Sequence, residues 1–460
     1  MFSLDYLQQD TIGLTYVLNQ LTPDSPFGVE AKKRIAPLGY KNALENIFDN
    51  MEKIINLLHE DEKSLKKLRT HLKAFKNIRG SMIHSQIFTQ VELFEIKHFL
   101  ITFEKLMLAY KKLSIDFVGL ELYPMDVPLA IIDPDGRRIG TFSFTSPVLE
   151  EIRTKKRYIE KQNLMTERPA IVEQEVEEET RIAVELSMQL KKYTELFLIN
   201  MDTLGKLDIT IAKVMLATKL QATRPQLSET LLSFKNMSNP YVEDALVKMN
   251  QNMTQISLSM TTGVTMITGA NMGGKSVALK TVVLNTILCQ LGFFVFAEFA
   301  EIPIFDDIHL ISEDMQDIGQ GLSSFGAEVL RLNEIIECLK SKRLLIALDE
   351  FARGTNPTEG AAIVRAVAAY LHESDTISIM STHYNKVVSP EYKHYQVAGL
   401  NFPDTLQQWD VSSIAQNMDY ALVEVSSETP PPQDAINICK MIGLNKSLLI
   451  KIQEGMKEYD

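Results

Sequence analysis

A glycine-rich loop between an apolar strand and a helix most constrains how this chain can fold. The strand-like run GVTMITG (263–269) and the helical run KSVALKTVVLNTILCQL (275–291) enclose the sequence GANMGGKS (269–276). This spacing is GxxxxGK[ST], in the strand–loop–helix context that phosphate binding requires. Glycines let backbone N–H groups approach phosphate closely, and the helix N-terminus adds positive potential. The sequence therefore predicts a phosphate-binding loop, in which Lys275 reaches the β- and γ-phosphates of a nucleotide and Ser276 offers a hydroxyl to Mg²⁺.

Two further strands are predicted to end at the same edge as this loop. The apolar run RLLIALDEFARG (343–354) ends in Asp349 and Glu350, and the run TISIM is followed by STHY, which contains His383. An aspartate at such a strand end can hold the Mg²⁺ shell, and an adjacent glutamate can polarise the attacking water. His383 could contact the γ-phosphate, although a histidine taken alone is more often structural. Together these residues predict a site that binds and hydrolyses ATP.

The remaining chain divides by its periodicity. Helical patterns dominate up to about residue 220, and strands alternating with helices follow Pro225, which indicates a mostly parallel sheet. Two short apolar runs around the turn signal DPDG predict a β-hairpin. The expected fold is an α/β P-loop ATPase domain preceded by an α-helical core and lever domain that carries this small hairpin. The predicted boundaries are 1–222 for the helical domain, about 122–147 for the hairpin, 223–400 for the ATPase domain, and 401–460 for a C-terminal segment with a helical dimerisation element.

One segment is strongly basic. Between Lys63 and Arg79 the chain carries seven Lys/Arg and no acid, and its apolar residues recur at helical spacing. This pattern predicts an amphipathic helix with one apolar and one basic face. A basic face of this kind is ordinarily a solvated helix surface; the alternative is a contact with a nucleic-acid backbone or an acidic partner.

Composition excludes several other classes of protein. A net charge of −12 disfavours a protein that coats DNA with its whole surface. Three widely spaced cysteines indicate neither a disulfide framework nor a zinc site, and they fit a reducing cytoplasm. The N-terminus shows no secretory signal. The most apolar stretch is interrupted by Asn285 and Gln290, so we expect a buried helix and no membrane segment.

The ordered segments TGANMGGKS, LDEFARGTNPTEG and STHY resemble the ATPase domain of the MutS family, which is related to the ABC ATPases. SSFGAEVLRLNEII (323–336) is similar to that family's signature segment, with Phe325 and Glu328 at the expected spacing. Weaker resemblance extends over nearly the whole chain, including the helical core before residue 200 and the last helices, which pair subunits in the family.

The resemblance implies a role for each matched position. Nucleotide and Mg²⁺ would be bound by Gly269, Asn271, Met272, Gly273, Gly274, Lys275, Ser276 and Asp349, with Ser276 and Asp349 at the metal. Glu350 would be the catalytic base and His383 would sense the γ-phosphate. Ser323 or Ser324 would reach the ATP of a partner subunit, and Gly354-Thr355-Asn356 would form a loop at the dimer interface. A homodimer with two composite ATP sites is therefore expected.

The chain also departs from the family pattern. Ala270 and Val277 replace the usual proline and threonine of the loop, and SNPYVEDAL stands where an Arg-His-Pro stretch is usual, which leaves the adenine contacts undefined. Mismatch-repair members carry recognition domains before the helical core; this chain begins in that core, so we expect no mismatch recognition.

Three functions fit these features. The first is a MutS-like ATPase that acts on nucleic acid, with the Lys63–Arg79 segment as its sequence support. The second is an ATPase that remodels a protein client, because short MutS-like proteins with a DEFARGTNP segment look like the ATPase component of reactivases for cobalamin-dependent aminomutases. The third is a structural dimer regulated by nucleotide, which the intact Asp349-Glu350 pair disfavours.

Overall fold

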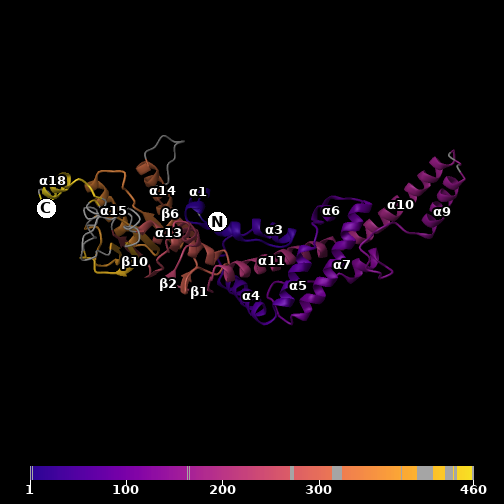
Figure 1. Ribbon diagram of the computed structural model, residues 1–460, viewed down its shortest axis with the longest axis horizontal. Helices are drawn as coiled ribbons and strands as arrows, with labels where there is room; N and C mark the ends of the chain where they lie inside the picture. The colour runs from indigo at the N-terminus through magenta and orange to yellow at the C-terminus, as the bar shows by residue number, and fades with distance from the viewer. Residues whose placement is uncertain are drawn as a thin grey trace. The chain divides into compact units, whose positions relative to one another are not determined.

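A computed structural model describes residues 2, 4–162, 164, 166–269, 274–312, 324–384, 386–400, 418–429, 439 and 443–457. The chain forms two compact units, and many of their elements are labelled in Figure 1. The first unit consists of Met1–Gln20, Ala36–Phe48 and Leu216–Asp460. The second unit consists of Leu21–Ile35 and Asp49–Met215.

The described residues of the second unit form helices and connecting segments without strands. Its helices are α3 (Pro26–Lys33), α5 (Glu62–Lys73), α6 (Arg79–His84), α7 (Gln90–Lys112), α8 (Asp126–Ile132), α9 (Pro147–Lys161) and α10 (Arg168–Lys191). Two more helices, α4 (Lys41–Glu60) and α11 (Thr194–Lys219), contribute residues to both units. Local signals explain where several begin: Thr89 and Glu92 form a capping box before α7, and Ser146 caps α9 ahead of Pro147.

Aromatic side chains form the centre of the second unit. Phe99 of α7 lies 5.1 to 6.0 Å, between ring centroids, from four other phenylalanine rings that come from α3, the end of α5, α7 and α11. Those partners are Phe27, Phe75, Phe103 and Phe197, all buried. Large rings brought together from separate helices supply much of the apolar area that holds such a bundle together.

The predicted hairpin at 122–147 is wrong. The turn at the DPDG sequence exists, with the Gly136 amide donating to the Asp133 carbonyl, but α8 precedes it and no strand follows it up to residue 146. Met125, Leu129 and Ile132 are buried in the first half of this segment, and their spacing of four and three is that of a helix face. Period-two alternation is therefore absent where the first strand was expected.

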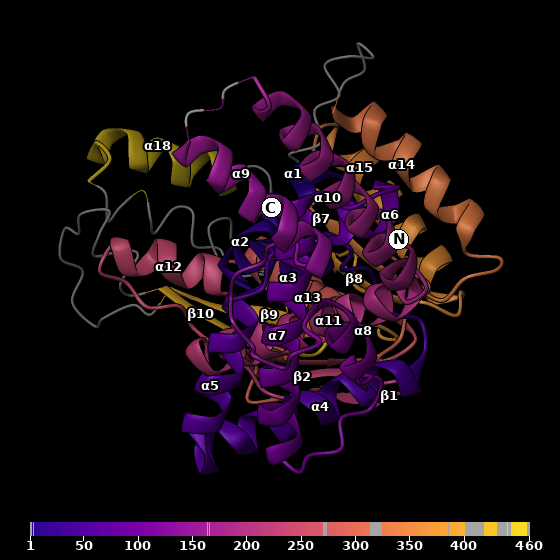
Figure 2. The same cartoon turned by 90° about the vertical axis from the view of Figure 1, so that its right-hand side faces the viewer.

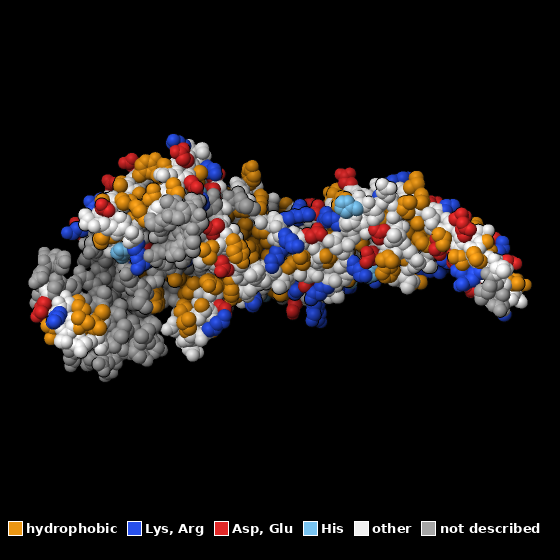
Figure 3. Space-filling view, turned by 90° about the horizontal axis from the view of Figure 1, so that it is seen from above, with side chains coloured by type: hydrophobic (Ala, Val, Ile, Leu, Met, Phe, Trp, Pro, Cys, Tyr) orange, Lys and Arg blue, Asp and Glu red, His pale blue; other side chains and the backbone are white. Residues whose placement is uncertain are grey.

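The basic segment Lys63–Arg79 is not one continuous helix as predicted, because α5 ends at Lys73 and α6 begins only at Arg79. Its apolar residues are buried, as predicted: Leu65, Leu68, Leu72, Phe75 and Ile78. Four of its seven cations lie within 4 Å of acidic side chains of the same unit: Arg69, Lys73, Lys76 and Arg79. On the face drawn in Figure 3, Lys and Arg side chains of the second unit are interspersed with Asp and Glu.

The first unit contains two sheets. A four-stranded sheet has the order β1-β5-β2-β3, with β1 (Gln226–Ser228), β2 (Leu232–Met237), β3 (Ile256–Met260) and β5 (Phe299–Pro303). A six-stranded sheet has the order β10-β9-β4-β8-β7-β6, with β4 (Gly263–Thr268), β6 (Asp307–Ile311), β7 (Leu344–Asp349), β8 (Ile377–Ser381), β9 (Lys393–Leu400) and β10 (Met418–Glu424). All its pairings are parallel except that of β9 with β10. The predicted mostly parallel sheet is confirmed.

Helices cover both faces of the six-stranded sheet. In the described part of this unit the helices are α1 (Tyr6–Thr11), α2 (Leu14–Gln20), α12 (Pro240–Lys248), α13 (Lys275–Gln290), α14 (Ser324–Cys338), α15 (Pro357–His372) and α18 (Lys446–Lys457). Helices α14 and α15 lie side by side (Figure 2) and share one buried cluster with alternate residues of β7: Leu344, Ile346 and Leu348. The intervening residues Leu345 and Ala347 face the opposite side, where α13 contacts β7 and β8.

The predicted domain boundaries need two corrections. Residues 1–20 and 36–48 belong to the unit that contains the P-loop, although their helical pattern assigned them to the helical domain. Strand β10 lies beyond residue 400, yet it pairs with β9 and extends the same sheet. Among the described residues, no helix is both long and apolar enough to cross a membrane. The apolar run 281–296 instead begins in α13, whose side chains are largely buried inside the first unit.

Candidate nucleotide-binding site

The glycine-rich loop leaves β4 at Gly269 and enters α13 at Lys275, as predicted. Gly269 has φ +145° and Gly274 has φ +81°, and a Cβ at Gly269 would lie 3.0 Å from the Cβ of Val397. Both positions therefore favour glycine, because an L side chain would be strained or crowded there. Asn271, Met272 and Gly273, which were expected to bind the nucleotide, lie outside the described residues.

Strand register brings three sequence segments to one edge. Ser381 of β8 pairs with Ile267 of β4 on one side and with Asp349 of β7 on the other. Because these strands are parallel, the residues after each of them emerge together at the carboxyl end of the sheet, where ligands of open α/β folds bind. The structure thus places Gly269, Glu350 and His383 at the same edge, in agreement with the sequence analysis.

The carboxylate of Glu350 lies among cationic side chains. Lys275 Nζ is 3.2 Å from Glu350 Oε1, and Arg353 Nη1 is 3.0 Å from Glu350 Oε2. His383 Nδ1 lies 3.8 Å from Glu350 Oε2. Lys275 also donates to the carbonyl of Gly269 at 3.0 Å. The lysine side chain is only 3% exposed, so its charge faces the loop and this carboxylate in a region shielded from water.

Ser276 and Asp349 form the second part of the site. The Ser276 hydroxyl donates to Asp349 Oδ1 at 2.9 Å, and the Ser381 hydroxyl donates to the same oxygen at 2.6 Å. Burial raises the pKa of Asp349 above its ordinary value, against the lowering effect of these two hydrogen bonds. Hydroxyl and carboxylate oxygens are the ligand types that Mg²⁺ prefers, so this pair fits the expected metal.

The backbone after β7 is strained at two positions. Glu350 has φ +49° and Ala352 has φ +62°, values that residues with a Cβ rarely adopt. The Glu350 amide donates to Ser381 Oγ at 3.0 Å, which ties the loop back to β8. Left-handed residues outside glycine persist only where surrounding contacts hold them, and they concentrate at functional sites.

Sequence reasoning missed Arg353 and Ser381. Arg353 lies in the segment LDEFARG and Ser381 in STHY, but only the register of β7 against β8 shows which atoms they contact. Two other expectations stay untested: Ser323 and the side chain of Ser324 lie outside the described residues. Asn356, assigned to an interface loop, is the N-cap of α15 and accepts from the Thr358 amide at 2.9 Å.

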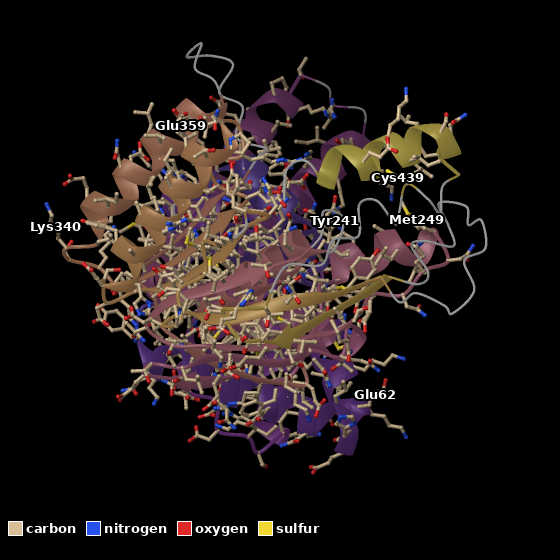
Figure 4. All side chains as sticks on the ribbon, turned by 90° about the vertical axis from the view of Figure 1, so that its left-hand side faces the viewer. Glu62, Tyr241, Met249, Lys340, Glu359 and Cys439 are labelled. Carbon is tan, nitrogen blue, oxygen red and sulfur yellow. The ribbon has the colours of Figure 1, made fainter. Side chains whose placement is uncertain are left out.

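The segment before the loop, where adenine contacts were left undefined, forms α12. Asn239 caps this helix through the Tyr241 amide and donates to the Ile12 carbonyl. Tyr241 and Met249, near the two ends of α12, are exposed (Figure 4). The asparagine is therefore engaged within the protein, whereas the tyrosine keeps an accessible ring.

These features define a P-loop nucleotide-binding domain. They are a glycine-rich loop before a helix, two acidic residues at the end of β7, which lies two strands from β4 in the sheet, and a serine–aspartate pair beside the lysine. Comparison with known proteins agrees. Residues 265–458 match the family model described as MutS domain V. Over these residues, which are less than half of the chain, the protein is similar to that domain of the MutS family.

Individual curated proteins show the same sequence similarity. The chain is 30% identical over 288 residues to Endonuclease MutS2 of Caldanaerobacter subterraneus, which aligns 62% of this chain with 34% of that protein. It is 32% identical over 288 residues to Endonuclease MutS2 of Pediococcus pentosaceus (62% and 35%) and 33% identical over 279 residues to that of Caldicellulosiruptor bescii (60% and 33%). The chain thus spans about a third of the length of these relatives. None of the three is named as a reactivase component, so the second function hypothesis gains no support from them.

Proposed function

We propose that this protein is a Mg²⁺-dependent ATPase whose nucleotide state switches a homodimer that acts on nucleic acid. The observation that carries the proposal is the convergence of Lys275, Ser276, Asp349 and Glu350 at one sheet edge. The name of the relatives, Endonuclease MutS2, supports nucleic acid as the target. A cytoplasmic location, expected from the cysteine pattern, stays a prediction.

The ion pair between Lys275 and Glu350 suggests how the site is used. In this pair the lysine neutralises the carboxylate, so ATP phosphates compete with Glu350 for the ammonium group. Once Lys275 contacts phosphate, Glu350 can accept a proton from the attacking water, while Arg353 still holds its second oxygen. Mg²⁺, when bound, would offset the negative charge of the phosphates. Ser276 and Asp349 would orient that ion, and His383 would contact the γ-phosphate.

Metal dependence tests the assignment of Asp349. Asp349→Asn keeps the shape of the side chain but removes its charge, so half-maximal ATP hydrolysis should need about 10- to 100-fold more Mg²⁺ than in the wild type. The measurement is phosphate release against Mg²⁺ concentration, with an EDTA blank. Asp375→Asn, at an exposed aspartate before β8, is the matched control and should leave the curve in place. An unchanged curve in Asp349→Asn would remove this residue from the metal shell.

The dimeric part of the proposal is tested by mixing variants. If Ser323 and Ser324 act on the partner's ATP, replacing both with alanine should lower turnover without much loss of nucleotide affinity. Lys275→Ala alone should also be inactive. In an equimolar mixture of the two variants, half of the dimers contain one subunit of each kind, and each of these dimers has one intact composite site. The mixture should therefore show about a quarter of wild-type activity. A mixture that stays inactive would show that the sites are not shared between subunits.

We propose that only three of the seven cations in the basic segment contact nucleic acid. Lys63, Lys66 and Lys67 are exposed and lie beyond ion-pair distance of any acidic group in the described part of the chain. The other four cations already have acidic neighbours. Three lysines on one helix fit a contact with phosphates that carries no information about base pairing.

The salt dependence of DNA binding tests this contact. With three phosphate contacts, log K should fall with log salt at a slope of about −3, against about −6 for all seven cations. Matched and mismatched duplexes should bind equally. Replacing Lys63, Lys66 and Lys67 together with glutamine should abolish binding, whereas Lys73→Gln, next to Asp24, should change it little. A preference for mismatched duplex would overturn this account, and no binding at low salt would favour a protein client.

A further inference from the structure

The backbone of Ala352 is held at both its N–H and its carbonyl group, which belong to the two peptide groups on either side of its Cα. Its N–H donates to Glu328 Oε2 of α14 at 2.9 Å, and its carbonyl accepts from the Tyr384 hydroxyl at 2.8 Å. Ala352 is fully buried, Glu328 is 4% exposed and Tyr384 is 8% exposed. The two hydrogen bonds therefore form in a region shielded from water, where an unpaired peptide group would be costly.

These contacts act on the strained part of the candidate active-site loop. Ala352 and Glu350 both have positive φ, and such strained residues persist only where neighbouring contacts hold them. Fixing the Ala352 peptide limits the conformations open to Glu350, two residues earlier, and to Arg353, the next residue. The direction of the Glu350 carboxylate thus depends on side chains that do not contact it in the structure.

Tyr384 reaches this peptide because position 360 is glycine. A Cβ built on Gly360 would lie 2.2 Å from the Tyr384 hydroxyl oxygen and 3.0 Å from the Ala352 carbonyl oxygen. Even alanine at position 360 would therefore displace the tyrosine hydroxyl, the Ala352 carbonyl or the start of α15. This is a second, independent sign that the chain is built to place the hydroxyl at this carbonyl.

Glu328 links the loop to α14. This helix begins at Ser324, and Glu328 lies about one turn later. The helix is anchored on the sheet by Leu332 and Ile335, so a movement of its first turn would reach the Ala352 peptide through the Glu328 carboxylate. One side chain therefore connects the start of α14 to the loop that carries Glu350.

We propose that Glu328 and Tyr384 are positioning residues that clamp the backbone on both sides of Ala352 and so hold Glu350 in place for hydrolysis, with Glu328 making this placement dependent on α14. The proposal rests on the function proposed for Glu350. It assigns neither residue to nucleotide binding. Losing the clamp should lower kcat and leave the affinity for ATP nearly unchanged.

The test compares four variants by kcat and by the equilibrium Kd for Mg-ATP. Glu328→Ala should lower kcat about 10- to 100-fold, because small misplacements of catalytic groups have effects of that size. Glu328→Gln keeps an oxygen that accepts from the amide and should recover most of this loss. Tyr384→Phe and Gly360→Ala should each lower kcat several-fold. Since Glu328 and Tyr384 hold the two peptide groups that flank one residue, the double variant Glu328→Ala/Tyr384→Phe should show clearly non-additive effects.

Further variants separate the clamp from the role proposed for Glu350 in hydrolysis. Glu337→Gln changes an exposed glutamate of the same helix and should behave as wild type. Tyr384→Phe removes a single oxygen, so it tests the clamp even if Glu328→Ala does not fold. If Tyr384→Phe and Glu328→Ala keep the wild-type kcat while Glu350→Gln is inactive, the positioning role of Glu328 and Tyr384 is refuted and the role of Glu350 stands. Wild-type hydrolysis by Glu350→Gln would instead overturn the role of Glu350.

Discussion

Replacing Lys275 with alanine should raise the Kd for Mg-ATP about 100-fold or more, because the variant loses a charge-assisted contact with the phosphates in a shielded site. The side chain is almost fully buried and already lies between the Gly269 carbonyl and Glu350. Its ammonium group therefore needs little reorganisation to meet a nucleotide. Isothermal titration with a slowly hydrolysed ATP analogue measures the change directly.

The matched control for this prediction is Lys340→Ala. Lys340 lies exposed beyond the end of α14 (Figure 4), and its removal should not alter the Kd. Thermal unfolding of Lys275→Ala without nucleotide shows whether the variant is folded. A folded Lys275→Ala variant that binds Mg-ATP with wild-type affinity would contradict the assignment of residues 269–276 as the phosphate-binding loop.

Much of the nucleotide site could be predicted because its signals are local. Strand β4, the loop glycines and α13 are consecutive, so the residue types themselves report the strand–loop–helix geometry. The ends of β7 and β8 could be placed at the same edge because parallel strands with helical connections all end on one side. Asp349, Glu350 and His383 were found in this way.

Contacts between residues far apart in the sequence could not be predicted. Gln8 of α1 donates to the Leu310 carbonyl, and the Leu38 amide donates to the Gln290 carbonyl; both bonds join early residues to the P-loop unit. Periodicity shows that residues 1–20 contain helices but says nothing about which unit they join. The predicted boundary of the helical domain failed for this reason.

The segment 122–147 shows a different limit. Its turn residues were interpreted correctly, but apolar runs of four or five residues fit a short helix as well as a strand. In the structure the carboxylate of Asp133 binds Lys97 at 3.0 Å and Arg138 at 2.9 Å, so one long-range and one local ion pair hold the turn that follows α8. Despite its burial, these contacts lower the pKa of Asp133 to about 2.

The residues proposed to position Glu350 were the least predictable part of the candidate site. Glu328 was noted only for its resemblance to a signature segment, and neither Tyr384 nor Gly360 was noted for the Ala352 peptide. Their importance depends on a buried amide and carbonyl that become visible only when α14, β8 and α15 are assembled. Residue types in the sequence identify the chemically reactive side chains, whereas the side chains that orient them are identified only by tertiary packing.

The rate of phosphate release by Glu350→Gln under single-turnover conditions tests the central claim most directly. Glutamine keeps the shape of the side chain but cannot accept the proton of the attacking water, so the rate should fall about 100-fold or more. Affinity for Mg-ATP should be retained or rise, since Lys275 loses its competing carboxylate. Wild-type protein and Glu337→Gln should release phosphate at the same rate. If Glu350→Gln releases phosphate as fast as the wild type, or if the wild type releases none, this site is not the hydrolytic centre that the account describes.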